Sequence, residues 1–491
     1  MYFFKSTCGS CARLAKLSGL AFRAVFLAVF VFFIAAGLQA QVSQTVYFMD
    51  RLPQSSLVNP AYQHKHNFHL LLPAVSSFNV NAGTNFMSYN DIIFRHHTYD
   101  SLITFLHPDA NTADFTSGLK KRNSLGSDLH INILSLGFRA RRSFISFNIS
   151  ERFSGQASLP GDLIKIAMEG NQQFIGRTAD FSGIGIDVNY FREYAVGYSY
   201  RTDEVMSLGI RAKMLYGKSG ISSGKKDISL YTDPETYNMR MRSDFTMNVS
   251  MPATVLRDEE GNISDIRLHF ENDHYDPLDF IFNTNNPGFA VDLGATYRIT
   301  GPVMLYASIT DVGFINWKQD VYNFSMNGEM EFEGIDLSPL FDIINDSEPD
   351  SDFVDTLRSR FRVNDTSDPY RVWLPAKIYV GGTYDLTSGI NMGLLSRSAV
   401  YQGNLRQAVT VSANASAGRR LSASMSYSVM NNSFNNFGMG LSLRGGGFQL
   451  YVVSDNLNTV FYPHRTGNVN LWFGLNIVLG NVKPLQSLPS G

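Results

Sequence analysis

Apolar and polar residues alternate strictly near the C-terminal end of the chain. The residues at every second position from Leu421 to Val429 are apolar, and the four residues between them are all serine. Strict alternation with a period of two predicts a β-strand with one apolar face and one polar face.

The same alternation recurs from about residue 67 to residue 479. It predicts separate strands at, for example, 205–217, 226–232, 288–299, 407–417 and 469–479. The polar faces consist mainly of Ser, Gly, Asn and Thr, and only 17% of the residues are charged. The outer strands of a soluble sandwich usually carry many Lys and Glu residues. An apolar outer face with small polar residues inside is typical of a closed barrel in a membrane.

The spacing of the strands supports this interpretation. Many of them span about 9–13 residues, close to the ~9–11 residues of a tilted transmembrane strand. Short turns, expected at 191–192, 300–302, 387–388, 418–420 and 445–447, alternate with long polar loops. This asymmetry is typical of outer-membrane barrels, which have short periplasmic turns and long external loops. The expected fold is all-β, an antiparallel transmembrane barrel of about 14 strands.

The first forty residues have the organisation of a signal peptide. Four basic residues and no acidic residue precede an apolar run at 24–37. The expected cleavage site lies after this run, between Ala40 and Gln41. The alternative is a membrane anchor, but the run is shorter than the ~20 residues of a spanning helix. The only cysteines, Cys8 and Cys11, lie in this leader, so the mature chain is expected to contain none.

The remaining chain divides into three parts. Residues 41–66 lack alternation and contain two prolines, so we expect them to lead into the lumen or to plug it. The barrel is expected at 67–480 and a tail at 481–491. Within the barrel, residues 160–175 predict a short amphipathic helix. Residues 335–361 end in a second helical pattern.

Charge is distributed unevenly along the mature chain. Without the four bases of the leader, 37 Lys and Arg residues face 43 Asp and Glu residues, a net charge of about −6 that argues against nucleic acid as a partner. Residues 328–369 hold 12 acids against 3 bases, and residues 257–279 hold 8 against 2. Solvated loops account for both segments. The alternative is a surface that binds cations or partner proteins.

Motifs of catalysis are not found. The sequence has neither a GxSxG elbow nor a P-loop. The ten histidines include a cluster at 64–69 and a pair at 96–97, but neither has the helical spacing and carboxylate of a zinc enzyme. We interpret them as polar residues of loops and lumen. The sequence therefore predicts a protein that is not an enzyme, with no catalytic residues, metal or cofactor.

Several motifs resemble those of a known group of proteins. YFMDRLPQSSLVNPAY, from Tyr47 to Tyr62, resembles the mature start of Bacteroidota outer-membrane proteins, including the PorP/SprF type IX secretion family and a related uncharacterised domain-of-unknown-function family. Segments 288–299, 305–317, 375–386 and 448–457 resemble the strand motifs of that uncharacterised family. These families look like relatives of FadL-type transporters of hydrophobic substrates, which implies a barrel of about 14 strands with an N-terminal plug.

Two functions follow as hypotheses. The first is a porin-like, FadL-like barrel in the outer membrane that transports or binds a small hydrophobic ligand, with outer-membrane lipid around it. The second is a scaffold that docks type IX secretion-system or surface proteins through its acidic loops. A transporter needs a continuous path through the lumen, whereas the lumen of a scaffold can be filled. The expected lumen-facing residues are Asp187, Arg211, Asp292, Arg298 and Asp385.

Overall fold

A computed structural model gives the fold of the chain. It describes residues 44–71, 77–95, 102–104, 107, 112–203, 205–257, 263–269, 276–332, 362–401, 404–430, 433–462 and 467–480. Three predictions fall outside these residues: the cleavage junction at Ala40–Gln41, the tail at 481–491 and the segment 335–361 with its helical pattern.

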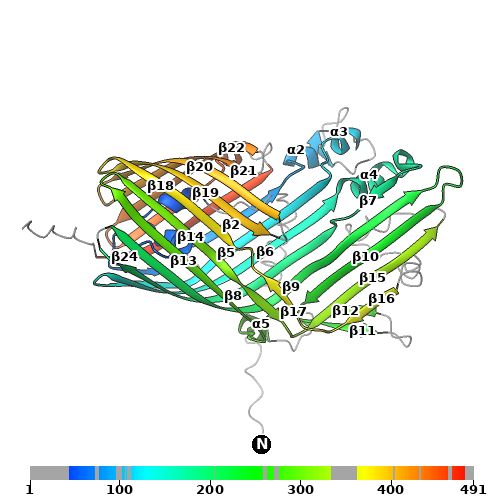
Figure 1. The fold of residues 1–491 in the computed structure, drawn as a ribbon, viewed down its shortest axis with the longest axis horizontal. Helices are drawn as coiled ribbons and strands as arrows, with labels where there is room; N and C mark the ends of the chain where they lie inside the picture. Colours follow the sequence, from blue (N-terminus) through cyan, green and yellow to red (C-terminus); the bar gives the residue numbers. More distant parts are fainter. Residues whose placement is uncertain are drawn as a thin grey trace, which may run out of the picture.

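The strands form a closed antiparallel barrel with 14 strand positions (Figure 1). One position is shared by β1 (Phe68–Leu71) and β2 (Phe78–Thr84), which both pair with β24 and with β5 and so close the ring. The other positions are, in order, β5 (Arg122–Ala140), β6 (Ser143–Pro160), β8 (Gly185–Arg201), β9 (Met206–Thr232), β13 (Asn286–Thr300), β14 (Val303–Trp317), β18 (Lys377–Thr387), β19 (Ile390–Tyr401), β20 (Asn404–Ala417), β21 (Leu421–Met430), β22 (Ser433–Gly445), β23 (Phe448–Ser454) and β24 (Asn468–Leu479). This confirms the predicted fold class.

The alternation of the sequence becomes the two faces of the wall. Met425 on β21 is 63% exposed, whereas its neighbours Ser424 and Ser426 are 1% and 6% exposed. The same in–out pattern holds on β20, where Val411 is exposed and Thr410 is buried. The predicted outward apolar face and inward small polar face are therefore confirmed for these strands.

Most connections at one end of the barrel are tight turns. Thr300 pairs with Val303, Thr387 with Ile390, Ala417 with Leu421, and Gly445 with Phe448. These are the turns predicted at 300–302, 387–388, 418–420 and 445–447. We call this end the turn end and the opposite one the loop end.

Two predicted strand breaks are wrong. The predicted turn at 191–192 lies within β8, which continues through it with only a register shift between Tyr190 and Phe191. Arg192 is tolerated there because its guanidinium pairs with Glu151 on the neighbouring strand β6. The predicted strands 205–217 and 226–232 are likewise one strand of 27 residues, β9.

The length of β9 extends the sheet beyond the barrel at the loop end (Figure 1). Its first part pairs with β13, and its last part pairs with β10 (Met239–Ser250). The sheet continues through β15 (Val321–Phe332) to β16 (Arg362–Thr366), while β7 (Thr178–Asp180) also pairs with β9 and β17 (Tyr370–Trp373) pairs with the end of β14.

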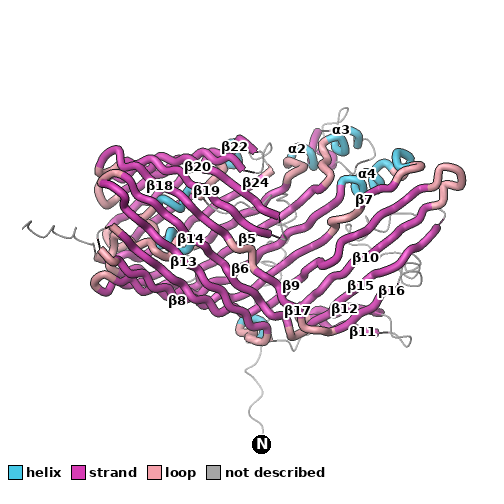
Figure 2. The backbone as a smooth tube through the Cα atoms, viewed as in Figure 1, coloured by secondary structure: helices cyan, strands magenta, loops and turns pink. Residues whose placement is uncertain are grey.

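Helices are short and lie at the margins or inside the barrel (Figure 2). The helix predicted at 160–175 is present as α4 (Gly161–Glu169), followed by the 3-10 turn η3 (Gln172–Phe174). The remaining elements are η1 (Thr45–Phe48), η2 (Pro53–Leu57), α2 (Tyr89–Ile92), α3 (Thr112–Ser117), α5 (Pro277–Ile281), α8 (Asn458–Phe461) and the strand pairs β3 (Ile93–Arg95) with β4 (Leu102–Thr104) and β11 (Ala253–Arg257) with β12 (Ile263–Leu268). Among the described residues, no helix is both long and apolar enough to cross a membrane.

Candidate functional site

Residues 44–66, which we call the inner segment, lie inside the barrel and are mostly buried. The main-chain N–H groups of Gln44 and Thr45 donate to the two carboxylate oxygens of Asp455, at 2.7 and 2.9 Å. The side-chain amides of Gln54 and Asn476 exchange hydrogen bonds of 2.8 and 3.1 Å. The segment is therefore fastened to β24 and to the chain that follows β23.

The inner segment also carries a hydrophobic core. Its apolar residues pack on large side chains that point inward from the wall, among them Tyr379, Tyr451 and Trp472. The rings of Tyr47 and Tyr379 stack with centroids 5.3 Å apart. The inner face of the wall thus carries small polar side chains on some strands and aromatic side chains where it contacts the inner segment.

Two paired glycines allow the Asn59-Pro60-Ala61 turn to lie directly on the wall. Gly209 on β9 and Gly294 on β13 are register partners. A side chain on Gly209 would collide with the Pro60 carbonyl, and one on Gly294 would collide with the Asn59 side chain. Within the turn, the Ala61 N–H donates to the Asn59 side chain at 3.0 Å. The glycine pair therefore fixes the place where the inner segment meets β9 and β13.

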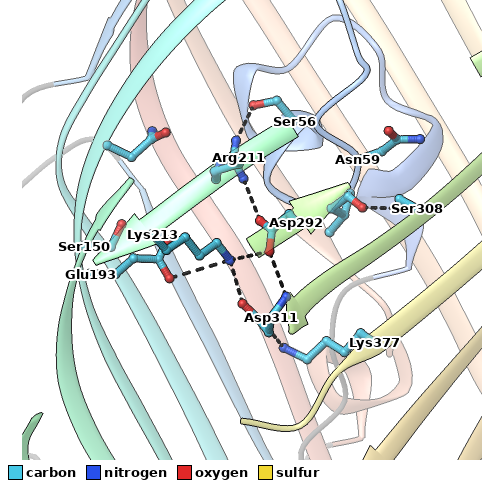
Figure 3. A network of polar contacts seen from close by, with 12 residues as sticks. Ser56, Asn59, Ser150, Glu193, Arg211, Lys213, Asp292, Ser308, Asp311 and Lys377 are labelled. Carbon is cyan, nitrogen blue, oxygen red and sulfur yellow. Dashed lines mark hydrogen bonds and ion pairs between the residues drawn. The ribbon is translucent and has the colours of Figure 1, made fainter. Parts of the chain in front are cut away.

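Beside this turn, a group of buried charges crosses the inner wall (Figure 3). Its members, which we call the charge network, are Arg152, Glu193, Arg211, Lys213, Asp292, Asp311 and Lys377. They come from β6, β8, β9, β13, β14 and β18, so the network joins strands across nearly half of the barrel.

Lys213 lies at the centre of the charge network. Its Nζ is 2.8 Å from Asp292 Oδ1, 2.7 Å from Asp311 Oδ1 and 3.8 Å from Glu193 Oε2. All four side chains are almost completely buried. Each ion is expensive to bury alone, so the mutual pairing is required for this arrangement to be stable.

The outer members complete the pairing. Arg152 contacts Glu193 at 3.1 Å and Asp311 at 3.2 Å. Lys377 contacts Asp311 at 2.9 Å. Arg211 lies 3.5 Å from Asp292 and donates to the Ser56 hydroxyl at 3.4 Å, which links the charge network to the inner segment.

Local backbone structure on β14 makes the network possible. The pairing of β13 with β14 shifts register between Val291 and Leu293, so that two residues of β14 lie opposite the single residue Asp292 of β13. One of them is Asp311, whose φ of 62° is the left-handed conformation that aspartate tolerates better than most residues. This bulge re-aims the Asp311 side chain, as bulges commonly do.

A cavity of about 80 Å³ adjoins the charge network inside the barrel. Arg152, Asp311 and Lys377 line it on one side. Apolar and aromatic side chains also line it, including Leu57 and Val58 of the inner segment, Phe153, Phe191, Tyr379 and Trp472. The cavity therefore presents apolar surface and charge to the same space.

The five residues expected to face the lumen occupy three places. Arg211 and Asp292 belong to the charge network. Asp187 pairs with Lys226 at 3.2 Å, towards the loop end of β8. Arg298 and Asp385 pair at 3.3 Å near the turn end and are about a third exposed.

The sequence interpretation missed most of the charge network, namely Arg152, Glu193, Lys213, Asp311 and Lys377. One signal was present, because Arg211 and Lys213 are two apart and so share a face of one strand. Glu193 directly follows the predicted turn at 191–192, and Asp311 leaves the alternation at a bulge. Neither position could be placed inward by counting.

Three histidines lie close together where the inner segment continues into β1. The rings of His64 and His66 stack 5.1 Å apart, and His66 Nε2 lies 3.3 Å from His69 Nδ1. His69 also contacts the Ser135 hydroxyl at 3.3 Å. Among the described residues, no group of three or more His, Cys, Asp or Glu side chains is arranged to hold a metal ion.

Comparison with known proteins identifies the family. Residues 60–455 match the model described as "Family of unknown function (DUF5723)", so the chain belongs to this family. This confirms the expected membership of a domain-of-unknown-function family. No curated protein sequence matches the chain.

The chain is also similar to solved structures at very low sequence identity. The Ralstonia pickettii toluene transporter TbuX is 9% identical, covering 91% of this chain and 97% of its own, with a TM-score of 0.40. A Pseudomonas aeruginosa FadL homologue is 11% identical, covering 91% and 100%, with a TM-score of 0.38. The Pseudomonas putida toluene transporter TodX is 7% identical, covering 90% and 94%, with a TM-score of 0.36.

Proposed function

We propose that this member of DUF5723 is a non-enzymatic barrel of the outer membrane that binds a small hydrophobic molecule and transports it across that membrane. The observation that carries the proposal is the cavity between the inner segment and the charge network. Ligand sites commonly combine apolar side chains with fixed polar groups. This cavity combines aromatic and aliphatic side chains with the fixed charges of the charge network.

The outer surface of the wall supports a place in a membrane. Exposed apolar side chains occur on strand after strand around the barrel: Val196, Met214, Leu293, Leu305, Val380, Leu394, Val411, Met425, Leu443, Leu450 and Phe473. A soluble protein rarely exposes so continuous an apolar surface. Lipid is the partner that matches it.

The inner segment sets how passage would occur. It fills the barrel towards the turn end, so a molecule that enters from the loop end meets the cavity first and the inner segment next. Passage therefore requires the inner segment to move. The contact between Arg211 and Ser56, at 3.4 Å, is longer than the contacts of Gln44 and Thr45 with Asp455, at 2.7 and 2.9 Å.

Trp472 provides a direct test, because its indole lines the cavity. We expect a small brominated aromatic such as 4-bromophenol to quench the fluorescence of the purified barrel with a saturable dependence on concentration. Trp472→Phe should remove the saturable component. Trp373→Phe is the matched control, since Trp373 is 67% exposed. Quenching that does not saturate, or that persists unchanged in Trp472→Phe, would exclude a binding site in this cavity.

A second candidate function is the scaffold. The sheet of β9, β10, β15 and β16, which projects past the barrel at the loop end, favours it (Figure 1). Such a projection offers a surface to a partner protein without a path through the lumen. A filled lumen is compatible with a scaffold, so the two functions differ in whether the cavity takes a ligand.

A further inference from the structure

A second cavity, of about 250 Å³, opens at the turn end of the barrel. It lies between the inner segment and the ends of β21, β22 and β24. Five basic side chains line it: Arg51, Lys65, Arg419, Arg420 and Arg444. None of the described residues that line it is acidic. We call it the basic pocket.

Two of the five basic side chains are held by the backbone around them. Arg51 Nη1 donates to the carbonyl of Gly418 in the turn between β20 and β21. Arg444 Nη2 donates to the carbonyls of Val478 and Gly480, at 3.2 and 3.4 Å. Guanidinium groups fixed in this way require little reorganisation to meet a ligand, because Arg presents a rigid, planar fork of donors.

A buried donor without a partner and the excess of positive charge around the pocket indicate an anionic ligand. Arg51 Nε is buried and has no hydrogen-bond partner among the described residues, although a buried donor of this kind is normally satisfied. Lys65 is paired with Asp50 at 2.9 Å, but Asp50 does not line the pocket. The concentration of like charge around one space is unfavourable when the space holds only water, and an anion relieves it.

We propose that the basic pocket binds the phosphate group of a phosphate ester. Several separate guanidinium groups suit a doubly charged group with several acceptor oxygens, and Arg is the residue that matches phosphate geometry best. The volume exceeds the ~30 Å³ share of a water molecule several-fold, so it accommodates more than a small inorganic ion. Leu421 and Val478 add an apolar strip for the organic part of the ester.

Two sources supply this chemistry: a soluble phosphate ester and the headgroup of a phospholipid. Leu421 is 38% exposed on the outer face of β21, so the basic pocket borders the apolar surface of the wall. The experiment therefore needs one arm for each source. The inference does not depend on the proposed function, because the cavity beside Trp472 lies elsewhere in the barrel.

The test is calorimetric titration of the purified full-length barrel in a zwitterion-free, sugar-based detergent. The soluble arm uses sn-glycerol 3-phosphate, and the lipid arm uses dihexanoyl phosphatidate below its micellar concentration. Saturable binding is expected in at least one arm, and the arm with the higher affinity identifies the source. Arg420→Gln with Arg444→Gln should weaken that binding at least tenfold, and Arg444→Lys should weaken it less.

The matched control is Arg141→Gln with Arg142→Gln, which removes the same charge from another turn at the same end. This variant should bind as the native protein does. Heat-modifiable migration on a gel verifies folding, and Arg420→Gln alone, on an exposed turn, replaces the double variant if that one does not fold. The proposal is overturned if neither ligand binds saturably, or if the basic-pocket and control variants weaken binding equally.

Discussion

The main-chain N–H of Asp311 donates a hydrogen bond of 2.7 Å to the carboxylate of Asp292 on the neighbouring strand. Both carboxylates also contact Lys213 Nζ, at 2.7 and 2.8 Å. Two acidic side chains are thus held side by side by one backbone donor and one shared ammonium group. The bulge that contains Asp311 brings this about, so a local backbone irregularity is the basis of the charge network.

Removal of the shared ammonium group should destabilise the barrel strongly. Lys213→Met leaves Asp292 and Asp311 buried with fewer counter-charges, and breaking a buried pair from one side typically costs ~3–5 kcal/mol. Urea unfolding in detergent micelles measures the change in free energy. Lys225→Gln is the control, because its pair with Asp244 is exposed and such pairs contribute little. Equal losses in the two variants would mean that the charge network does not stabilise the fold.

The glycine pair gives a prediction about the inner segment. Gly209→Val or Gly294→Val should displace the Asn59-Pro60-Ala61 turn, because a side chain at either position would occupy the space of that turn. The measurement is maleimide labelling of Ser55→Cys, a fully buried position, in a chain whose Cys8 and Cys11 are replaced.

Labelling should be slow in the parent and fast in both glycine variants. Gly301→Ala is the control, since a side chain there meets no atom within 4 Å. If the glycine variants label as slowly as the parent, the inner segment does not depend on this close approach.

The wall of the barrel could be predicted from the sequence because the relevant signal is local. On β21 the orientation of each side chain follows from its neighbours, so Ser424 and Met425 could be assigned to opposite faces by counting. The charge network could not be predicted in this way. Arg211 and Asp292 were nominated as inward charges, but their pairing with Lys213 and Asp311 depends on strand register and on one bulge. The sequence predicts a turn at Arg192, because nothing local shows its partner, Glu151, which is about forty positions away in sequence.

The depth of an outward position should determine how well it tolerates charge. Met425 and Leu405 are similarly exposed, at 63% and 65%, but Met425 lies in the middle of β21 and Leu405 lies at the loop end of β20. Arg at the middle of the bilayer costs ~2–4 kcal/mol and near its edge ~0–1 kcal/mol. Met425→Arg should therefore reduce heat-modifiable folding in lipid vesicles far more than Leu405→Arg. Indistinguishable variants would argue that lipid does not surround this face.

An Arg at an inward position on β21 should also be poorly tolerated. The Ser426 hydroxyl lies 2.7 Å from the Thr45 hydroxyl of the inner segment. A long side chain there would collide with the inner segment, so Ser426→Arg should also fold poorly. This cost should disappear in a variant that lacks residues 41–62 if that variant folds.

Processing of the N-terminus is predicted to occur between Ala40 and Gln41. Sequencing of the N-terminus of protein extracted from native membranes should begin at Gln41. Ala40→Leu is expected to slow this cleavage, because the peptidase prefers a small residue at that position. Mature protein that begins at Met1 would show that residues 1–40 are kept as an anchor.

Deletion of part of the acidic loop separates the two candidate functions. Residues 337–357 lie between β15 and β16, in a stretch whose acidic residues would be unfavourable inside hydrocarbon. The pairing of β15 with β16 through Met326 and Val363 does not involve them. Replacing 337–357 by a short Gly-Ser linker should therefore leave the barrel folded by heat-modifiable migration.

In that variant, a channel should keep the saturable quenching of Trp472 by 4-bromophenol, because the cavity is built from residues of the wall and the inner segment. A scaffold should instead lose the proteins that co-purify with the native barrel from its own membranes. A second variant replaces 337–357 by a Gly-Ser-Asp-Glu repeat of the same length, which keeps acidic residues in the loop but changes their sequence. It shows whether partner binding depends on the negative charge of the loop or on its sequence. Residues 328–332 and 362–366 of the acidic segment belong to β15 and β16, so the loop interpretation of 328–369 is left for the part between these strands. If the deletion prevents folding, the deleted residues contribute to the barrel itself, and that interpretation is wrong.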